Sequence, residues 1–374
     1  MTRLSHRQLN RATLERQLLL GRASIGAADA VRRVVALQAQ EPASPYIALW
    51  NRIDEFDPGH LDEAFSSHRV VKATLMRITL HAVHVDDYPS FHQAMQGTLR
   101  AARFNDRRFL QTGLSPDDAH RLVPDLRKFA SESRTKDEIE EKLRDHVDDP
   151  SWVWWALRQV GSFWHAPSDE PWSFGRRPTY VAARTDGRED RNESVQRLIR
   201  RYLAGFGPAS PQDFAQFALL RRADIRPALE TMADLVELEG PGGKTLLDVA
   251  DGEIPDETTP APPRLMAMWD STLLAHKDRS RIIPEDYRRL VIQRNGDVLP
   301  SVLVDGFVSG VWRPVDQGIE ITAFHSLSDE VWDGLHLEAG ELMSLLADRE
   351  PRVYSRYSRW WVDLPAAEVR VIPA

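Results

Sequence analysis

The sequence predicts a mainly helical α+β protein with a β-rich carboxyl-terminal region, and three observations support this. Apolar residues recur at helical spacing over 6–19 and 26–37. An order of helices followed by a strand then returns further along the chain. After the Pro-rich, acidic segment 254–263, apolar residues alternate between turns at NGD, VDG and DQG, which favours antiparallel hairpins.

Two helices are expected to open the chain. Leu9, Leu14 and Leu18 share one helical face over 6–19, and an Ala- and Val-rich stripe does the same over 26–37. A third helix is expected from residue 60. The segment KATLMRITLHAVHV (72–85) is expected to be extended, because Thr, Ile and Val favour strands.

The same order is clearest over 192–238, where three amphipathic segments precede the strand VELEG. The stretch GPASPQDF places Ser, Pro and Asp at a helix start, where these residues cap the backbone. Three short helices followed by a strand pair form a winged helix. The region 116–181 is expected to hold another copy, so the chain is interpreted as tandem winged-helix motifs.

These patterns predict four regions. They are a first winged-helix region over 1–110, a second winged-helix-like region over 111–185, a third winged-helix region over 186–253 and the β-rich region over 264–374. A transcription regulator with one winged helix rarely needs so many copies. Tandem copies instead indicate a protein that embraces its target.

Composition narrows the function further. The 374 residues carry a net charge of −8 and no cysteine, which excludes disulfides, thiolate metal sites and cysteine nucleophiles and fits a cytoplasmic protein. The longest apolar runs fall short of the ~20 residues of a membrane span, and the start has no signal-peptide pattern. Arginine gathers in 99–109 and 349–361, so a basic face is compatible with the acidic total.

The stretch VVALQAQEPASPY (34–46) places two glutamines where a helix pattern stops. On a continuing helix, Gln38 and Gln40 would point about 200° apart. In extended chain, residues i and i+2 share a side, and Pro42 favours this case because it pushes Glu41 out of the α region. Two amides would then converge on one small group. The alternative is that both amides cap the helix end or face water.

Several ordered motifs carry a family resemblance. LQAQ after an Ala/Val helix, PYIALWNRI, MRITLHAVHVDDY, RLMAMWDSTLLAHKDRSRII and VLVDGFVSGVW together resemble the AlkZ/YcaQ family of bacterial alkylpurine DNA glycosylases, over nearly the whole chain. The Gln-x-Gln form of the motif is similar to the AlkZ-type branch, although Ala39 is smaller than the apolar residue often found there.

The resemblance implies a base-excision repair enzyme acting on double-stranded DNA that contains alkylated purines, with bulky adducts or interstrand crosslinks among its substrates. An N7-alkylated purine is already cationic and leaves as a neutral base, so a strong acid catalyst is unnecessary. Gln38 and Gln40 are then expected to hold the hydrolytic water. No lysine lies near the motif in sequence, so a monofunctional glycosylase without cofactor or metal is expected, and it is expected to be a monomer.

Other candidate residues are expected to contact DNA. Arg77, Thr79 and His81 match an Arg-x-Thr-x-His pattern of the family and share one face if the chain is extended. Interleaved Arg and aromatic residues in SRYSRWW suit contact with a DNA backbone or an unstacked base. The remaining DNA-binding candidates are Arg281, Arg352, Arg356 and Tyr357.

Two alternatives stay open. Asp270 and the arginines after it are interpreted as mainly structural, with Asp–Arg pairing beneath the β-rich region and a phosphate contact from Arg281. The alternative to an enzyme is a non-enzymatic winged-helix DNA-binding protein or transcription regulator. Excision of an N7 adduct from duplex DNA distinguishes the two.

Overall fold

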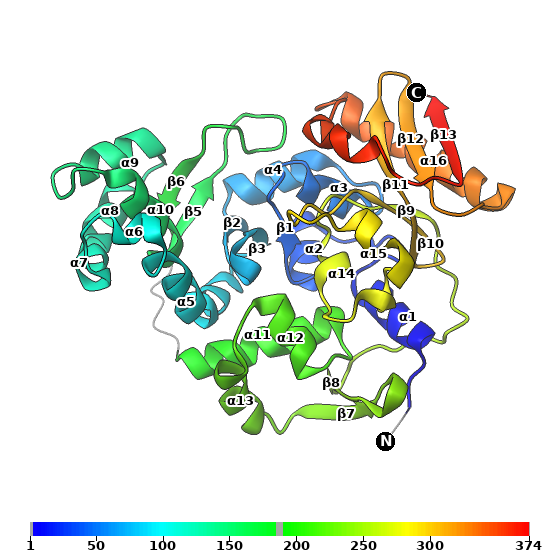
Figure 1. Cartoon of the computed structure of the whole chain (residues 1–374), viewed down its shortest axis with the longest axis horizontal. Helices are drawn as coiled ribbons and strands as arrows, with labels where there is room; N and C mark the ends of the chain where they lie inside the picture. The colour runs from blue at the N-terminus through cyan, green and yellow to red at the C-terminus, as the bar shows by residue number, and fades with distance from the viewer. Residues whose placement is uncertain (1–2, 185–189, 374) are drawn as a thin grey trace.

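The computed structural model of the chain describes residues 3–184 and 190–373, so the expected boundary at 185/186 lies outside the described residues. Figure 1 shows helices α6 to α10 at the left, α11 to α13 at the lower centre and a separate sheet beside the carboxyl terminus at the upper right. The predicted class, α+β with tandem winged-helix motifs and a β-rich end, is confirmed.

The first unit packs helices against the start of a six-stranded antiparallel sheet. Its elements are α1 (His6–Arg16), α2 (Ala27–Arg33), β1 (Leu37–Gln38), α3 (Ser44–Trp50), α4 (Pro58–Ser66), β2 (Val70–Thr74), the 3₁₀ turn η1 (Met76–Ile78), β3 (Leu80–His84) and α5 (Tyr88–Phe104). The chain is extended at Gln38 as expected, but α2 ends earlier than the predicted 37, because Val35 takes a left-handed φ of 75°.

The expected single strand over 72–85 is wrong. It is a hairpin, because Arg77 and Ile78 take left-handed φ values of 54° and 58° and reverse the chain between β2 and β3. The strand propensity of these residues favours an extended chain at the turn, but the surrounding structure imposes the left-handed conformation.

The second unit continues the same sheet. Its elements are α6 (Arg107–Leu110), α7 (Pro116–Arg121), α8 (Val123–Phe129), β4 (Arg134–Thr135), α9 (Lys136–Leu143), α10 (Pro150–Val160), β5 (Phe163–Ala166) and β6 (Thr179–Ala182). The strand order is β1-β3-β2-β5-β6-β4, and Lys72 of β2 pairs with His165 of β5. The first two predicted regions therefore share one sheet.

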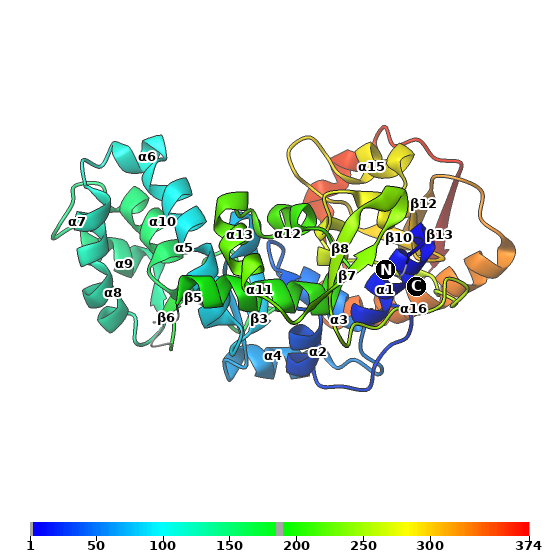
Figure 2. The same cartoon turned by 90° about the horizontal axis from the view of Figure 1, so that it is seen from below.

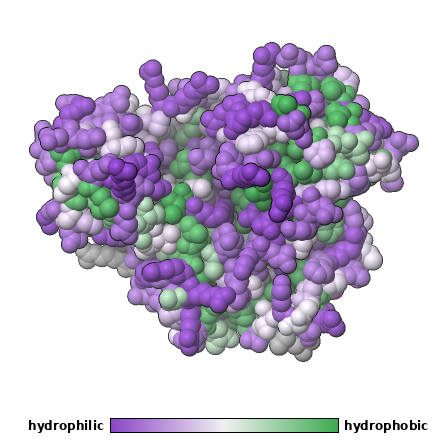
Figure 3. Space-filling view, viewed as in Figure 1, coloured by the Kyte–Doolittle hydropathy of each residue, from purple (hydrophilic) through white to green (hydrophobic). Residues whose placement is uncertain are grey.

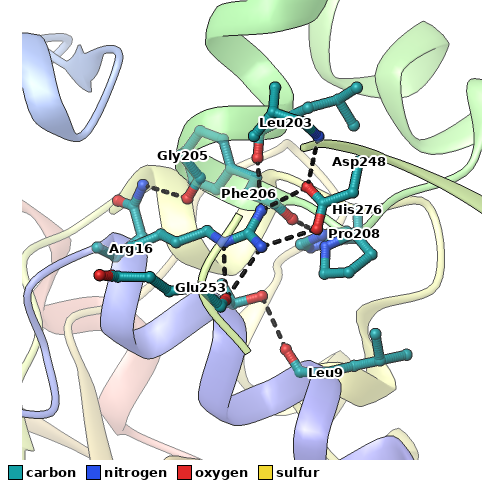
Figure 4. Close-up of polar contacts among 12 residues, drawn as sticks. Leu9, Arg16, Leu203, Gly205, Phe206, Pro208, Asp248, Glu253 and His276 are labelled. Carbon is teal, nitrogen blue, oxygen red and sulfur yellow. Dashed lines mark hydrogen bonds and ion pairs between the residues drawn. The ribbon is translucent and has the colours of Figure 1, made fainter. Parts of the chain in front are cut away.

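The third unit is the winged helix that the sequence shows most clearly. Its elements are α11 (Arg191–Phe206), α12 (Pro211–Ala218), α13 (Arg222–Glu230), β7 (Leu235–Glu239), the 3₁₀ turn η2 (Pro241–Gly243) and β8 (Thr245–Val249). A capping box of Ser210 and Asp213 starts α12, as the sequence predicts. Arg16 of α1 forms a buried bidentate ion pair with Asp248 at 2.7 and 2.8 Å and also donates to the Leu203 carbonyl, which ties the first unit to this one (Figure 4).

The carboxyl-terminal region holds a five-stranded antiparallel sheet of order β13-β12-β11-β10-β9. Its elements are β9 (Arg264–Leu265), α14 (Ser271–Leu274), η3 (Arg279–Arg281), α15 (Glu285–Val291), β10 (Ser301–Val304), β11 (Phe307–Val315), β12 (Gly318–Ala323), α16 (Asp329–Ala347), η4 (Ser355–Trp361) and β13 (Glu368–Pro373). The hairpins expected at VDG and DQG are present. The 19-residue helix α16 was not expected.

The units are arranged along the molecule. Figure 2 shows helices α6 to α10 at one end, the carboxyl-terminal sheet at the other and α11 to α13 between them. Hydrophilic residues cover most of the face in Figure 3, with hydrophobic residues in smaller patches. No helix in the described ranges is long and apolar enough to cross a membrane.

Candidate active site at the glutamine pair

Gln38 and Gln40 line one cavity of about 410 Å³. Gln38 lies in β1, where it pairs with His81 of β3. The chain stays extended for one more residue, since the Ala39 N–H donates to the Leu80 carbonyl at 2.8 Å. Gln38 is 5% exposed and Gln40 is exposed, so the pair runs from the sheet interior to the cavity mouth.

Arg77 fixes the orientation of the Gln38 amide. Its Nη2 donates to Gln38 Oε1 at 2.9 Å, and its Nη1 donates to the Phe217 carbonyl of α12 at 3.1 Å. Because a guanidinium only donates, the amide oxygen must face Arg77 and the NH₂ remains as the donor for the cavity. Burial, and then the charge of Arg279, lower the pKa of Arg77 to about 10, so it stays protonated at neutral pH.

His81 supports Arg77 from the sheet interior. It is fully buried, its Nδ1 lies 3.0 Å from the Thr79 carbonyl, and its Nε2 lies 3.2 Å from Arg77 Nη2. A carbonyl only accepts, so Nδ1 carries the proton and Nε2 accepts from Arg77. Burial, and then the Arg77 charge, lower the pKa of His81 to about 3, so the ring is neutral.

The predicted grouping of Arg77, Thr79 and His81 therefore exists, but not through an extended chain. Arg77 sits in the turn η1, and Thr79 joins it in lining the cavity, while His81 alone of the three lies in a strand. The turn η1 places the Arg77 guanidinium over β3, the strand that follows the turn. The DNA contact of His81 stays a prediction. Its complete burial argues against that contact, because a duplex cannot reach the ring.

The carboxyl-terminal region supplies the opposite wall of the cavity, which sequence reasoning missed. Trp269, Arg279, Asn295 and Asp297 line it. Asp297 is held by Trp360 Nε1 at 2.8 Å and by Asn295 Nδ2 at 2.9 Å. The NGD motif was interpreted only as a turn. Its Asn and Asp side chains were the signal in the sequence that could have indicated this wall.

Arg281 and Asp270 have structural contacts. Arg281 is 8% exposed and donates to the Pro208 carbonyl at 2.9 Å. Little of its side chain is therefore accessible for the predicted phosphate contact. Asp270 forms a bidentate pair with Arg52 of the first unit at 2.8 and 2.9 Å, and both side chains are fully buried. The predicted Asp–Arg pairing is present, with a partner far away in sequence.

Arg352, Arg356 and Tyr357 lie beside the glutamine motif. Tyr357 donates to Glu41 at 2.7 Å, and Arg356 forms an ion pair with the same carboxylate, which directly follows Gln40. Arg352 and Arg356 are exposed, which leaves both able to meet a DNA backbone.

A lysine lies near the glutamine motif in space. No lysine is near the motif in sequence, but Lys72 of β2 lines a second cavity that Gln40 also lines. Sheet pairing places Lys72 beside Ala82 and on the opposite face from His81 and Gln38. Lys72 is thus close to the motif in space and separated by the sheet from the cavity that both glutamines line.

A winged-helix scaffold around a cavity lined by amides and arginines is typical of a protein that acts on DNA. The chain belongs to the AlkZ-like DNA glycosylase family, because the family model described as "DNA glycosylase AlkZ-like" matches residues 31–345. It is therefore a DNA glycosylase, a hydrolase of N-glycosyl bonds, and its substrate is DNA.

A relative and a solved structure are similar over most of the chain. The "Interstrand DNA cross-link repair glycosylase" of Streptomyces sahachiroi is 25% identical over 344 residues, which cover 86% of this chain and 91% of that protein. The solved structure of the Streptomyces sahachiroi DNA glycosylase AlkZ matches with a TM-score of 0.78 at 21% identity, covering 94% of this chain and 99% of that one.

Proposed function

We propose that this glycosylase removes N7-alkylated purines from duplex DNA, with Gln38 and Gln40 holding the attacking water. The observation that carries the proposal is the Arg77 to Gln38 contact of 2.9 Å, which leaves the Gln38 NH₂ to donate into the cavity. Gln40 makes no side-chain hydrogen bond within the described part of the chain, so its amide oxygen is available to accept from water.

The two amides divide the work on one water molecule. Gln38 donates a hydrogen bond to one lone pair of the water and Gln40 accepts a hydrogen bond from one of its O–H groups, so a second lone pair remains for attack on the anomeric carbon. The new C1′–O bond forms as the C1′–N9 bond breaks, and the bonding pair neutralises the cationic purine. One proton of the water stays on the new C1′ hydroxyl and the other passes to solvent, so a neutral base and an abasic sugar result.

Two features favour this mechanism over a carboxylate-driven one. Within the described residues, Asp297 is the carboxylate that lines this cavity, and its hydrogen bonds to Trp360 and Asn295 engage its charge. An activated leaving group needs positioning more than proton transfer. We extend the substrates to bulky adducts and interstrand crosslinks, since the similar Streptomyces protein is described as acting on cross-linked DNA.

The test uses a duplex carrying one 7-methylguanine and counts alkali-labile abasic sites. Gln38→Ala and Gln40→Ala are each expected to lower the single-turnover rate about 100-fold, the order seen when one positioned hydrogen-bonding group is removed. Gln111→Ala is the matched control, because Gln111 is exposed and does not line the cavity. Full excision by both cavity variants would refute the assignment.

Monofunctionality is a separate proposal with its own test. Borohydride should trap no covalent complex between the protein and damaged DNA, because the sheet lies between Lys72 and the cavity that Gln38 lines. A trapped complex that disappears in Lys72→Met would show that this lysine reaches the sugar. The regulator alternative predicts sequence-specific duplex binding without excision, and family membership weighs against it.

A further inference from the structure

A second cavity of about 470 Å³ adjoins the glutamine cavity at Gln40, which lines both. Its walls come from the β5–β6 connection (167–178) and from the segment that follows α16. Figure 1 shows this connection extending from the second unit toward the carboxyl-terminal region. Cavities of roughly 300–1,000 Å³ are the size that encloses ring-bearing small molecules.

Lys72 lines this cavity, and its ammonium has no hydrogen-bond acceptor among the residues that the structure describes. It is 4% exposed, and its Nζ lies 4.2 Å from the centre of the Phe174 ring. No ion pair or hydrogen bond of its ammonium occurs across the described residues. Burial lowers its pKa to about 7. Burying an amine without a hydrogen-bond acceptor costs folding free energy. A ligand that supplies an acceptor would satisfy this donor.

The walls combine flat apolar rings with further donors. Phe174 and Trp172 are 9% and 4% exposed, and the Trp172 ring is fixed by its Nε1 hydrogen bond to Glu350 at 2.8 Å. Arg176 and Arg177 line the cavity from its exposed side, and neither makes an ion pair in the part of the chain that the structure describes. Rigid rings bind planar groups, and unpaired donors bind acceptor oxygens.

We propose that this cavity binds the N7 substituent of the lesion, and that the substituents it takes are bulky, ring-bearing and rich in acceptor oxygens. The proposal rests on the proposed function. A purine held at the glutamine pair has its sugar bond at the water site, and its N7 substituent leads past Gln40 into the second cavity. The aromatic walls hold the rings, and Lys72 donates to an oxygen.

The experiment compares two duplexes, one with 7-methylguanine and one with the N7-guanine adduct of aflatoxin B1 epoxide. The measured quantity is the ratio of kcat/KM for the bulky lesion to kcat/KM for the methyl lesion. Lys72→Met removes the donor and keeps the volume, while Ser168→Trp narrows the cavity from its exposed side. Each is expected to lower the ratio about 10-fold. Lys128→Met, at an exposed lysine, is the matched control and should leave it unchanged.

The outcomes separate this inference from the proposed function. If the kcat/KM ratio is unchanged in both Lys72→Met and Ser168→Trp, the inference is overturned. This includes the case where excision of both lesions slows by the same factor, which would indicate that the cavity holds DNA phosphates. Wild-type protein that excises neither lesion would instead refute the proposed function.

Discussion

Two cations, Arg77 and Lys72, line the two cavities that meet at Gln40, and their surroundings differ. Arg77 donates to Gln38 and to the Phe217 carbonyl, and it holds an amide in one orientation. The Lys72 ammonium lies over the Phe174 ring and makes no hydrogen bond or ion pair within the described residues. A cation whose N–H groups are all hydrogen-bonded makes a site rigid, whereas a cation with free N–H groups can donate them to a ligand. This difference supports the proposed roles, catalysis in the first cavity and recognition of the N7 substituent in the second.

The largest effect should come from Arg77→Met. Gln38 would no longer have the hydrogen bond that orients it, and misplacing a positioning group costs about 100-fold in rate. Single-turnover excision of 7-methylguanine measures this. If Arg77 acts through Gln38, the double variant with Gln38→Ala should be no slower than Gln38→Ala alone. Multiplicative losses would contradict the positioning role and would indicate an independent effect of Arg77.

A smaller effect is expected on stability from Lys72→Met. The pKa of Lys72 falls from 10.5 to about 7 on folding, so the unfolded chain binds more protons between these values and wild-type stability rises with pH across that window. Removing the amine should raise the free energy of unfolding, most at pH 7 and least near pH 10. The change is at most ~1.4 kcal/mol per pH unit. Urea unfolding at both pH values measures it, and an equal gain at both would count against a buried, uncompensated amine.

The smallest effect should come from the exposed arginines at the rim of the second cavity. Arg352→Gln and Arg356→Gln should each weaken duplex binding only a few-fold, because both arginines already pair with carboxylates, Asp316 and Glu41. Fluorescence anisotropy at several salt concentrations should show the salt slope falling by about 1 for each phosphate that no longer has an arginine partner. An unchanged slope would remove the residue from the DNA-binding surface.

Local patterns predicted the elements well where local chemistry decides them. The Ser210 capping box, the extended chain at Gln38 and the carboxyl-terminal hairpins are all present. The hairpin between β2 and β3 was missed, because the left-handed turn at Arg77 carries neither Gly nor Asn to signal it. Helix α16 was missed because the alternating runs that precede it indicated a β-rich region throughout.

The sequence by itself determined the extended spacing of Gln38 and Gln40, since prolines and parity act within a few residues. It also carried the ordered motifs of the family. Tertiary structure alone decided what surrounds that pair. Phe217 holds Arg77 from 140 residues away, Asp270 finds Arg52 across 218 residues, and Lys72 reaches a cavity beside Gln40 through sheet pairing. Such contacts depend on strand register and on packing between distant segments, which no local pattern encodes.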